Sequence, residues 1–265
     1  MEKIVIIPTY NENENIERIL HAIFSLKQHF HILVIDDGSP DGTAEIVKNL
    51  QADYAGQLFI EERKGKLGLG TAYIHGFKWA IDRGYLYIME MDADFSHSPS
   101  DLQRLYEACK FGGADVAVGS RYVRGGGNVN WPWDRVLLSK GASIYTRLIT
   151  WMPVKDSTAG FVCYKKKVLE AINLDEIKFV GYAFQIEMKF ASWKLGFKIK
   201  EVPIIFEDRQ FGISKMNKGI VKEGILGVLK LRWYSLFKNY HSRLKNEMGK
   251  DESLEMRKSE SPKVH

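Results

Sequence analysis

The first half of the chain alternates short apolar runs with longer segments in which apolar residues recur at helical spacing. Residues 4–7, 32–35, 58–60, 85–91 and 115–119 are short and apolar, which predicts five strands. Between them, helical spacing predicts helices at 15–30, 43–50, 70–83 and 100–110. Strands that alternate with helices in this way predict an α/β domain with a parallel sheet and crossover helices. Strands that are apolar throughout favour a sheet covered on both faces.

The second half is less regular. Its glycine-rich stretch at 125–128 predicts a loop, and the pattern predicts helices at 137–152 and 184–195 and strands at 161–164 and 198–206. Residues 220–240 combine an apolar stripe with basic residues, which predicts an amphipathic helix. Residues 241–265 have few large apolar residues and mixed charge, so we expect a poorly ordered tail. We therefore expect one main domain at 1–219, an appended helix at 220–240 and a tail at 241–265.

Composition places the chain among ordinary globular proteins, with 45% hydrophobic and 27% charged residues. Its two cysteines, Cys109 and Cys163, are far apart, which argues against a disulfide framework or a thiolate zinc site and favours a reducing cytosol. The apolar run before Pro8 is too short for a signal peptide. No stretch approaches about 18 consecutive apolar residues, so we expect no transmembrane helix.

The net charge of +5 is unevenly distributed. Between residues 209 and 245 there are nine Lys or Arg residues and one acidic residue, Glu223. Such a basic segment suits phosphates, nucleic acid or an acidic membrane surface, and it is equally typical of a solvated helix face.

Two carboxylates, Asp92 and Asp94, follow the predicted strand at 85–91. In an extended chain, residues i and i+2 project to the same side, so the pair can hold a hard divalent cation through oxygen ligands. Such a cation can bridge the oxygens of a diphosphate and neutralise a leaving group. The alternative interpretation is a pair of turn-forming and helix-capping aspartates.

Three further polar stretches lie where predicted strands end. The stretch "VIDDGSPDGT" has the residues of a βα turn, and Asp37 is the candidate there for contacting a base or ribose. In "PTYNENENI", Glu12 would lie near the same crevice. The stretch "GKLGLGTAY" precedes a helix whose N-terminal amides could face an anion, although it lacks the spacing of a Walker A motif.

Arginines near small polar residues are candidates for binding phosphate. Arg121 follows the strand at 115–119, and Arg135 and Ser139 are four residues apart on one face of a predicted helix. For Arg135 the alternative is a surface ion pair with Asp134. Further along, "FEDRQFGISK" places Arg209 and Lys215 around a glycine, which suits a mobile loop over a diphosphate.

In this order, PTYNE, DDGSPDGT, GLGTAY, DADFSH, GSRY, WDRVLLSKGA and DRQFGISK resemble the dolichyl-phosphate mannose synthase group of family 2 glycosyltransferases. The resemblance covers about residues 3–232. It implies a GT-A fold, in which a nucleotide-binding α/β sheet is merged with an acceptor-binding part. It also implies inverting transfer of a hexose from a nucleotide sugar, with GDP-mannose favoured, to a polyprenyl phosphate.

The resemblance also implies roles for individual residues. The nucleoside would contact four of them: Pro8, Tyr10, Glu12 and Asp37. Asp92 and Asp94 would hold Mg²⁺ or Mn²⁺ on the donor diphosphate, with Asp94 the more direct ligand. Many relatives have Gln where this chain has Ser96, so we expect no third strong side-chain ligand there.

By the same resemblance, the acceptor phosphate would be held by Arg121, Arg135 and Ser139, while Arg209 and Lys215 would close over the donor diphosphate. The acceptor phosphate is already an anion, so no general base is nominated. Catalysis would consist of positioning together with stabilisation of the departing diphosphate by the metal and by basic side chains.

Many members of this family carry C-terminal transmembrane helices, and this chain has none. We expect the segments at 137–152 and 220–240 to lie on the cytoplasmic face of a membrane, as a peripheral contact beside anionic lipid. The alternatives are that the apolar stripe packs on the protein's own core, or that a separate subunit anchors the enzyme.

Other functions stay open from the sequence. The donor could be UDP-glucose or another UDP-hexose. A different class of protein would bind sugar nucleotides at a membrane without catalysis, although the intact Asp92/Asp94 pair argues against it. Nucleic-acid binding is disfavoured because no recognised module is present. A nucleotidyltransferase would need a basic glycine-rich loop near the N-terminus, where "PTYNENEN" is acidic.

Overall fold

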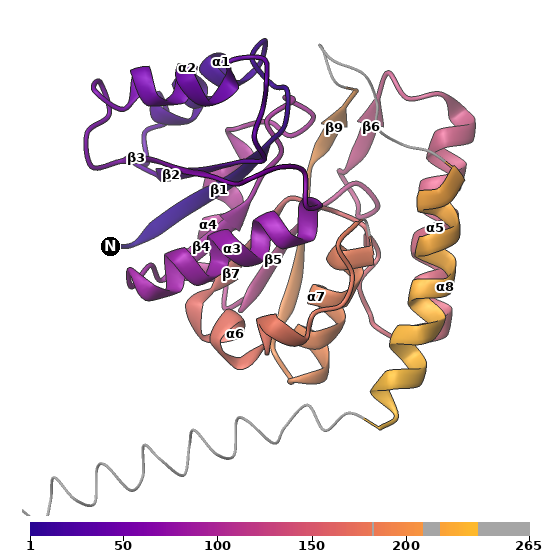
Figure 1. Cartoon of the computed structure of the whole chain (residues 1–265). Coiled ribbons are helices and arrows are strands. Elements are labelled where there is room, and N and C mark those ends of the chain that lie inside the picture. Colours follow the sequence, from indigo (N-terminus) through magenta and orange to yellow (C-terminus); the bar gives the residue numbers. More distant parts are fainter. Residues whose placement is uncertain (182, 209–217, 238–265) are drawn as a thin grey trace, which may run out of the picture.

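A computed structural model describes residues 1–181, 183–208 and 218–237 of the 265-residue chain. Its centre is a seven-stranded sheet with the strand order β3-β2-β1-β4-β7-β5-β8 (Figure 1). The strands are β1 (Lys3–Thr9), β2 (His31–Asp36), β3 (Leu58–Glu62), β4 (Tyr87–Glu90), β5 (Val116–Ser120), β7 (Val162–Lys165) and β8 (Ile199–Pro203).

The neighbouring strands of this sheet pair in parallel, except at β7, which runs antiparallel to both β4 and β5. The predicted parallel arrangement of the first four strands is therefore confirmed. Parallel strands end at one edge of a sheet, so the loops that follow β1, β2, β4 and β5 are brought together there. The chain enters β7 from this same edge, which is why β7 runs in the opposite direction.

Helices cover both faces of the sheet, as fully apolar strands require. Ile4 and Ile6 face one core beneath α3, α6 and α7, while Val5 and Ile7 face the other core beneath α1, α2 and α4. These helices are α1 (Ile16–Phe24), α2 (Thr43–Leu50), α3 (Leu69–Asp82), α4 (Asp101–Lys110), α6 (Lys166–Ala171) and α7 (Ala183–Lys194), with a short 3₁₀ helix at Leu174–Glu176.

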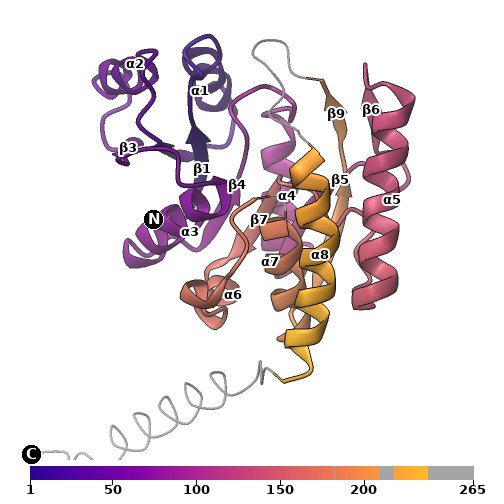
Figure 2. The same cartoon turned by 45° about the vertical axis from the view of Figure 1, so that its right-hand side comes forward.

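Two long helices, α5 (Trp133–Thr150) and α8 (Lys218–Ser235), lie side by side at one flank of the molecule (Figures 1 and 2). A third apolar cluster, which includes Met152, Phe190, Val228 and Leu231, joins them to α7. A small parallel sheet of β6 (Gly127–Val129) and β9 (Ile205–Glu207) lies near their ends. In the described part of the chain, no helix is long and apolar enough to cross a membrane.

Several predicted boundaries were wrong. The first helix ends at Phe24 rather than at residue 30, and the Ser25 hydroxyl donates to the Ala22 carbonyl in its last turn. The segment at 125–128 is not only a loop, because Gly127–Val129 pairs with β9. The strand at 198–206 is divided between the two sheets. Helix α6 was not predicted.

Two long helices also differ from their predicted limits. Helix α5 begins at Trp133 instead of residue 137, and α8 ends at Ser235 instead of residue 240. The expected tail at 241–265 lies outside the described residues. The division at residue 219 stays a prediction.

Candidate active site

The turn after β2 is stabilised by two aspartates that accept hydrogen bonds from nearby residues. Asp36 is buried and accepts hydrogen bonds from the Thr9 hydroxyl (2.9 Å), the Ser39 amide (2.8 Å) and the Ser39 hydroxyl (2.6 Å). Asp41 accepts from the Thr43 amide and hydroxyl. Burial raises the pKa of Asp41, but the hydrogen bonds from Thr43 and from the Asn13 and Asp41 backbone amides together leave the pKa below its usual value. Asp36 and Asp41 therefore stabilise the turn, whereas the Asp37 carboxylate contacts a residue outside it.

Asp37 is paired with Arg63, which follows β3. Nε and Nη2 of Arg63 lie 2.7 and 2.5 Å from Oδ1 of Asp37, and Nη1 donates to the Thr71 hydroxyl at 2.9 Å. Both charged side chains are about nine-tenths buried. The pair therefore places a fixed carboxylate at the carboxyl edge of the sheet. Arg63 was missed in the sequence, because nothing in its neighbourhood marks it as the partner of a residue 26 positions away.

The other residues expected to contact a nucleoside lie at the end of β1. Pro8 belongs to this strand, and Lys66 lies over the Tyr10 ring, with Nζ 5.0 Å from the ring centroid. Glu12 accepts a hydrogen bond from the Asn15 side chain at 3.0 Å. These residues and Asp37 therefore approach one edge of the sheet from neighbouring strands.

Asp92 and Asp94 follow β4 and line one cavity of about 560 Å³. Asp92 accepts a long hydrogen bond (3.4 Å) from the phenol of Tyr73, whose pKa is raised well above its usual value by burial. Asp94 is buried and accepts from the Ser96 amide at 3.1 Å. No cluster of three or more His, Cys, Asp or Glu ligands occurs among the described residues. Two carboxylates facing a cavity fit a hard cation that takes its other ligands from a diphosphate and water.

The cavity is lined by both polar and apolar residues. The polar ones include the two aspartates with Arg121, Arg135 and Ser139. From α5 and α8 the apolar lining comes from Leu137, Leu138, Ala142, Tyr145, Ile225 and Val228. A ligand with a charged head and a hydrocarbon chain would match both kinds of lining.

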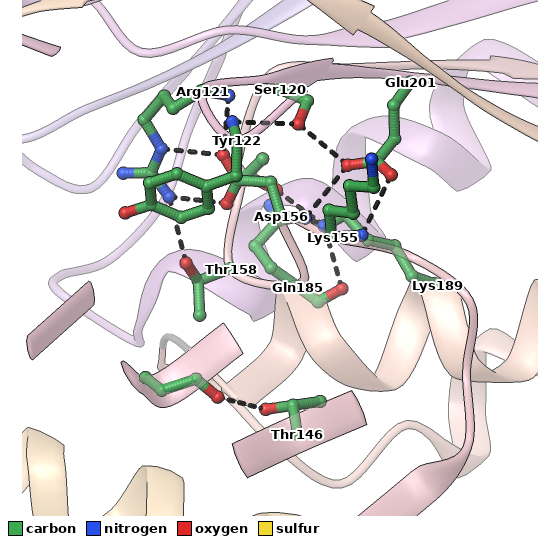
Figure 3. A network of polar contacts seen from close by, with 12 residues as sticks. Ser120, Arg121, Tyr122, Thr146, Lys155, Asp156, Thr158, Gln185, Lys189 and Glu201 are labelled. Atoms are coloured by element: carbon green, nitrogen blue, oxygen red, sulfur yellow. Dashed lines mark hydrogen bonds and ion pairs between the residues drawn. The ribbon is translucent and has the colours of Figure 1, made fainter. Parts of the chain in front are cut away.

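Arg121 is held by a buried carboxylate. Asp156, which is not exposed at all, accepts from the Arg121 amide (2.9 Å), Nε (2.8 Å) and Nη2 (2.6 Å), and Nη2 also donates to the Thr158 hydroxyl (3.0 Å; Figure 3). The guanidinium carbon also lies 5.1 to 5.4 Å from the centroids of three aromatic rings, those of Tyr122, Trp131 and Phe206. Charge pairing and ring contacts together fix the orientation of this cation.

Arg135 and Ser139 lie one turn apart on α5, as their spacing predicted, and both line the cavity. Nη1 of Arg135 donates to Asp208 at 2.8 Å, and the guanidinium lies 4.1 Å from the centroid of the Trp131 ring. The ion pair of Arg135 is thus formed with Asp208 and not with Asp134, the alternative considered from the sequence. Arg209 and Lys215 lie outside the described residues.

His97 is a cavity residue that the sequence interpretation missed, although it stands in the quoted "DADFSH". Its ring stacks on Phe161 with centroids 4.8 Å apart, and among the described residues its Nδ1 has no hydrogen-bond partner. Burial lowers the pKa of His97 to about 4, partly offset by Asp94, so the imidazole is neutral at physiological pH.

A second buried network lies behind the aspartate pair. Gln185 donates to Glu90 at 2.7 Å and accepts from Lys189 at 3.2 Å. Burial raises the pKa of Glu90 to about 8 and lowers that of Lys189 to about 8. Gln185 also lines the cavity, so this network forms part of its wall.

Comparisons with known proteins agree with this geometry. The sequence pattern of glycosyl transferase family 2 matches residues 4–172. The chain is 44% identical over 225 residues to the polyprenol monophosphomannose synthase of Mycolicibacterium smegmatis, covering 85% of this chain and 84% of that one. It is 43% identical over 240 residues to the undecaprenyl-phosphate mannosyltransferase of Micrococcus luteus, covering 89% and 98%.

Among solved structures, the fold resembles glucosyl-3-phosphoglycerate synthase from Mycobacterium tuberculosis in complex with Mn²⁺, UDP and glucosyl-3-phosphoglycerate. The TM-score is 0.65 at 16% identity, covering 86% of this chain and 79% of that one. The fold also resembles residues 1–349 of S. aureus TarS bound to UDP, with a TM-score of 0.59 at 17% identity, covering 88% and 64%. The predicted α/β class with a GT-A fold is confirmed.

Proposed function

The chain belongs to glycosyl transferase family 2, and from that premise we propose that it transfers mannose from GDP-mannose to a polyprenyl phosphate with inversion at the sugar carbon. The enzyme class, a hexosyltransferase, follows from the family and from relatives named for mannose transfer. The acceptor is proposed from the same two names, which specify polyprenol and undecaprenyl phosphate. GDP is proposed as the nucleotide because the sequence motifs resemble those of the dolichyl-phosphate mannose synthase group.

One observation carries the proposal: a single cavity is lined by the paired aspartates, by two arginines and by apolar side chains of α5 and α8. A polyprenyl phosphate has the matching form, with an anionic head on a hydrocarbon chain. In this assignment Arg121, Arg135 and Ser139 hold the acceptor phosphate, while Asp92 and Asp94 hold the donor diphosphate through a divalent cation. The two substrates then meet in this cavity.

The donor nucleoside is assigned to the edge of the sheet at the ends of β1, β2 and β3. Pro8, Tyr10 and Glu12 would border it, and Asp37 would accept hydrogen bonds from base or ribose. The contact between Arg63 and Asp37 supports this assignment, because it fixes the position of the carboxylate.

The metal is proposed to be Mg²⁺ or Mn²⁺, bound by Asp92 and Asp94. When bound, it would supply Lewis-acid stabilisation of the charge that develops on the departing diphosphate. A phosphate monoester is anionic at neutral pH, so its oxygen can attack the sugar carbon without a general base. We assign Arg209 and Lys215 to the donor diphosphate on the basis of the sequence motif.

We propose that α5 and α8 contact the cytoplasmic surface of a membrane. On these helices and at the C-terminal end of α5, large apolar residues are exposed, with exposed fractions of 79% for Trp133, 70% for Leu148, 72% for Trp151 and 63% for Trp233. On α8 the core contacts are made by Val228 and Leu231. The apolar stripe expected from the sequence comprises Ile220, Ile225, Leu226, Leu229, Trp233, Leu236 and Phe237; the side chain of Ile220 lies outside the described part of the structure, and the other six are exposed. Exposed Lys140, Arg147 and Lys230 flank it and suit anionic lipid. A separate anchoring subunit would use the same surface.

The test is a transfer assay with two donors. Purified protein is incubated with farnesyl phosphate, Mg²⁺ or Mn²⁺, and either GDP-mannose or UDP-glucose, and the lipid phase is analysed by mass spectrometry. Mannosyl-phospholipid formed from GDP-mannose alone and lost with EDTA supports the donor and the metal together. Product from UDP-glucose alone would replace the donor while keeping the site. Absence of product from both donors in the presence of anionic vesicles would contradict the proposal.

A further inference from the structure

The loop at 154–160, between α5 and β7, forms one wall of the cavity. Thr158, Ala159 and Gly160 line the cavity, and Asp156 in the same loop holds Arg121. The loop has no regular secondary structure of its own. Its shape must therefore be fixed by side chains from other elements.

At its N-terminal end the loop is held by Glu201 of β8. Oε1 of Glu201 accepts from the Asp156 amide at 2.9 Å, and Oε2 accepts from the Lys155 amide at 2.9 Å. Oε1 also accepts from the Ser120 hydroxyl at 2.8 Å. Figure 3 shows Glu201 beside Lys155 and Ser120, with Arg121 on the far side of Asp156. One carboxylate thus ties the loop to the end of β5, which is the strand that leads into Arg121.

At its C-terminal end the loop is held by Lys189 of α7. Its buried ammonium donates to the Ala159 carbonyl at 2.6 Å and to the Gln185 carbonyl at 3.0 Å. Lys189 therefore fixes the part of the loop that follows Asp156. Of the two residues, Glu201 is the one that accepts a hydrogen bond from the backbone amide of Asp156 itself.

The pairing of the strands explains why Glu201 can reach both partners. β8 is parallel to β5, with Glu201 beside Val118 and Pro203 beside Ser120. The carboxylate therefore lies next to the end of β5 and next to the loop that crosses it. Three hydrogen bonds to one carboxylate form a rigid junction, because each bond restricts a different segment.

We propose that Glu201 is a positioning residue for the acceptor phosphate, acting through Asp156 to set the orientation of the Arg121 guanidinium. The inference rests on the proposed function only in assigning a phosphate to Arg121. The chain of contacts runs from Glu201 to the Asp156 backbone, and from the Asp156 carboxylate to Arg121. Glu201 itself does not line the cavity.

The first test is Glu201→Gln, with steady-state kinetics varied separately in donor and acceptor. An amide cannot accept from both backbone amides and the hydroxyl, so at least one bond at the junction is lost. A loss of about 1.4 kcal/mol in the free energy of acceptor binding corresponds to about a tenfold higher KM for farnesyl phosphate, with the KM for the donor unchanged. An unchanged acceptor KM would overturn the proposal.

Glu187→Gln is the matched control. Glu187 also accepts from two backbone amides, those of Lys178 (2.9 Å) and Phe179 (3.1 Å), but it supports a different loop. The control is expected to lower thermal stability without raising the acceptor KM. If both variants raise the acceptor KM equally, Glu201 has only a structural role and the proposal fails.

A double-mutant cycle tests whether Glu201 acts through Arg121. In an Arg121→Lys background, Glu201→Gln is expected to change the acceptor KM by less than about twofold, since the residue that it positions has already been replaced. A full tenfold effect in that background would refute the mechanism. If Glu201→Gln does not fold, Ser120→Ala removes one of the three bonds and is expected to raise the acceptor KM about threefold.

Binding without turnover separates this inference from the proposed function. Farnesyl phosphate is titrated into wild-type and Glu201→Gln protein and followed by ³¹P NMR, with no donor present. Weaker binding by the variant supports the positioning role even if the wild type transfers no mannose. Equal binding by the two proteins together with normal transfer would overturn the positioning role and leave the proposed function intact.

Discussion

The ion pair between Arg121 and Asp156 gives a prediction about stability that does not depend on the substrate. The substitution is Asp156→Asn, which keeps the shape of the side chain and removes its charge. Asp156 is fully buried and Arg121 is 8% exposed at its side chain, so water cannot replace what is lost. An arginine left without its counter-ion in such a site is strongly unfavourable.

The magnitude follows from the three bonds that Asp156 accepts from Arg121. An Asn side chain has one acceptor oxygen, so its amide nitrogen must face at least one N–H donor of Arg121. Loss of one charge-assisted bond together with loss of the counter-charge of a buried arginine should lower the free energy of unfolding by about 3 kcal/mol. For a chain of this size, that corresponds to a melting temperature lower by roughly 6–12 °C.

The assay is thermal unfolding followed by circular dichroism, without substrates. Asp175→Asn is the matched control, because it breaks the ion pair between Lys78 and an Asp175 side chain that is 77% exposed. An exposed pair contributes little, so the control should melt like the wild type. A decrease of less than about 2 °C for Asp156→Asn would refute the claim that this pair is essential to the fold of the cavity wall.

Three other variants, one of them with a control, test the remaining assignments. Asp94→Ala should abolish transfer and weaken Mn²⁺ binding measured by calorimetry, and near-normal turnover would refute its role as a metal ligand. Arg135→Ala should raise the KM for farnesyl phosphate by about tenfold with the donor KM unchanged, whereas Arg104→Ala, on a helix away from the cavity, should change neither value. Replacing Trp151 and Trp233 together with Ser should reduce flotation with anionic vesicles; flotation equal to wild type would exclude this surface as the membrane contact.

Much of the site could be predicted because βα alternation determines which ends of the strands meet. Asp37, Asp92 and Arg121 each follow an apolar strand, and the parallel sheet brings the ends of those strands to one edge. Arg135 and Ser139 were placed on one helix face by spacing alone, and both line the cavity. These are local patterns, and the physical rules that connect them to structure are local as well.

The partners of these residues could not be predicted in the same way. Arg63 meets Asp37 across 26 positions, Asp156 meets Arg121 across 35, and Glu201 meets Asp156 across 45. Each contact depends on strand order and on the antiparallel insertion of β7, which hydrophobic periodicity does not specify. The signal available for Asp156 was weak: an acidic residue in a short polar stretch just before the apolar run at 161–164.

The two arginines assigned to the acceptor differ in how they are paired, and this difference separates their roles. Asp156 is buried and holds Arg121 through three hydrogen bonds, whereas Asp208 is 34% exposed at its side chain and accepts a hydrogen bond from Nη1 of Arg135. Before a phosphate binds, the guanidinium of each arginine needs a counter-charge, because an unpaired cation beside the apolar residues of the cavity would be costly to desolvate. The exposed pair can be exchanged for a phosphate at little cost, while the buried pair cannot. Loss of Asp156 should therefore lower stability as well as acceptor binding, whereas loss of Arg135 should weaken acceptor binding in a protein that still folds.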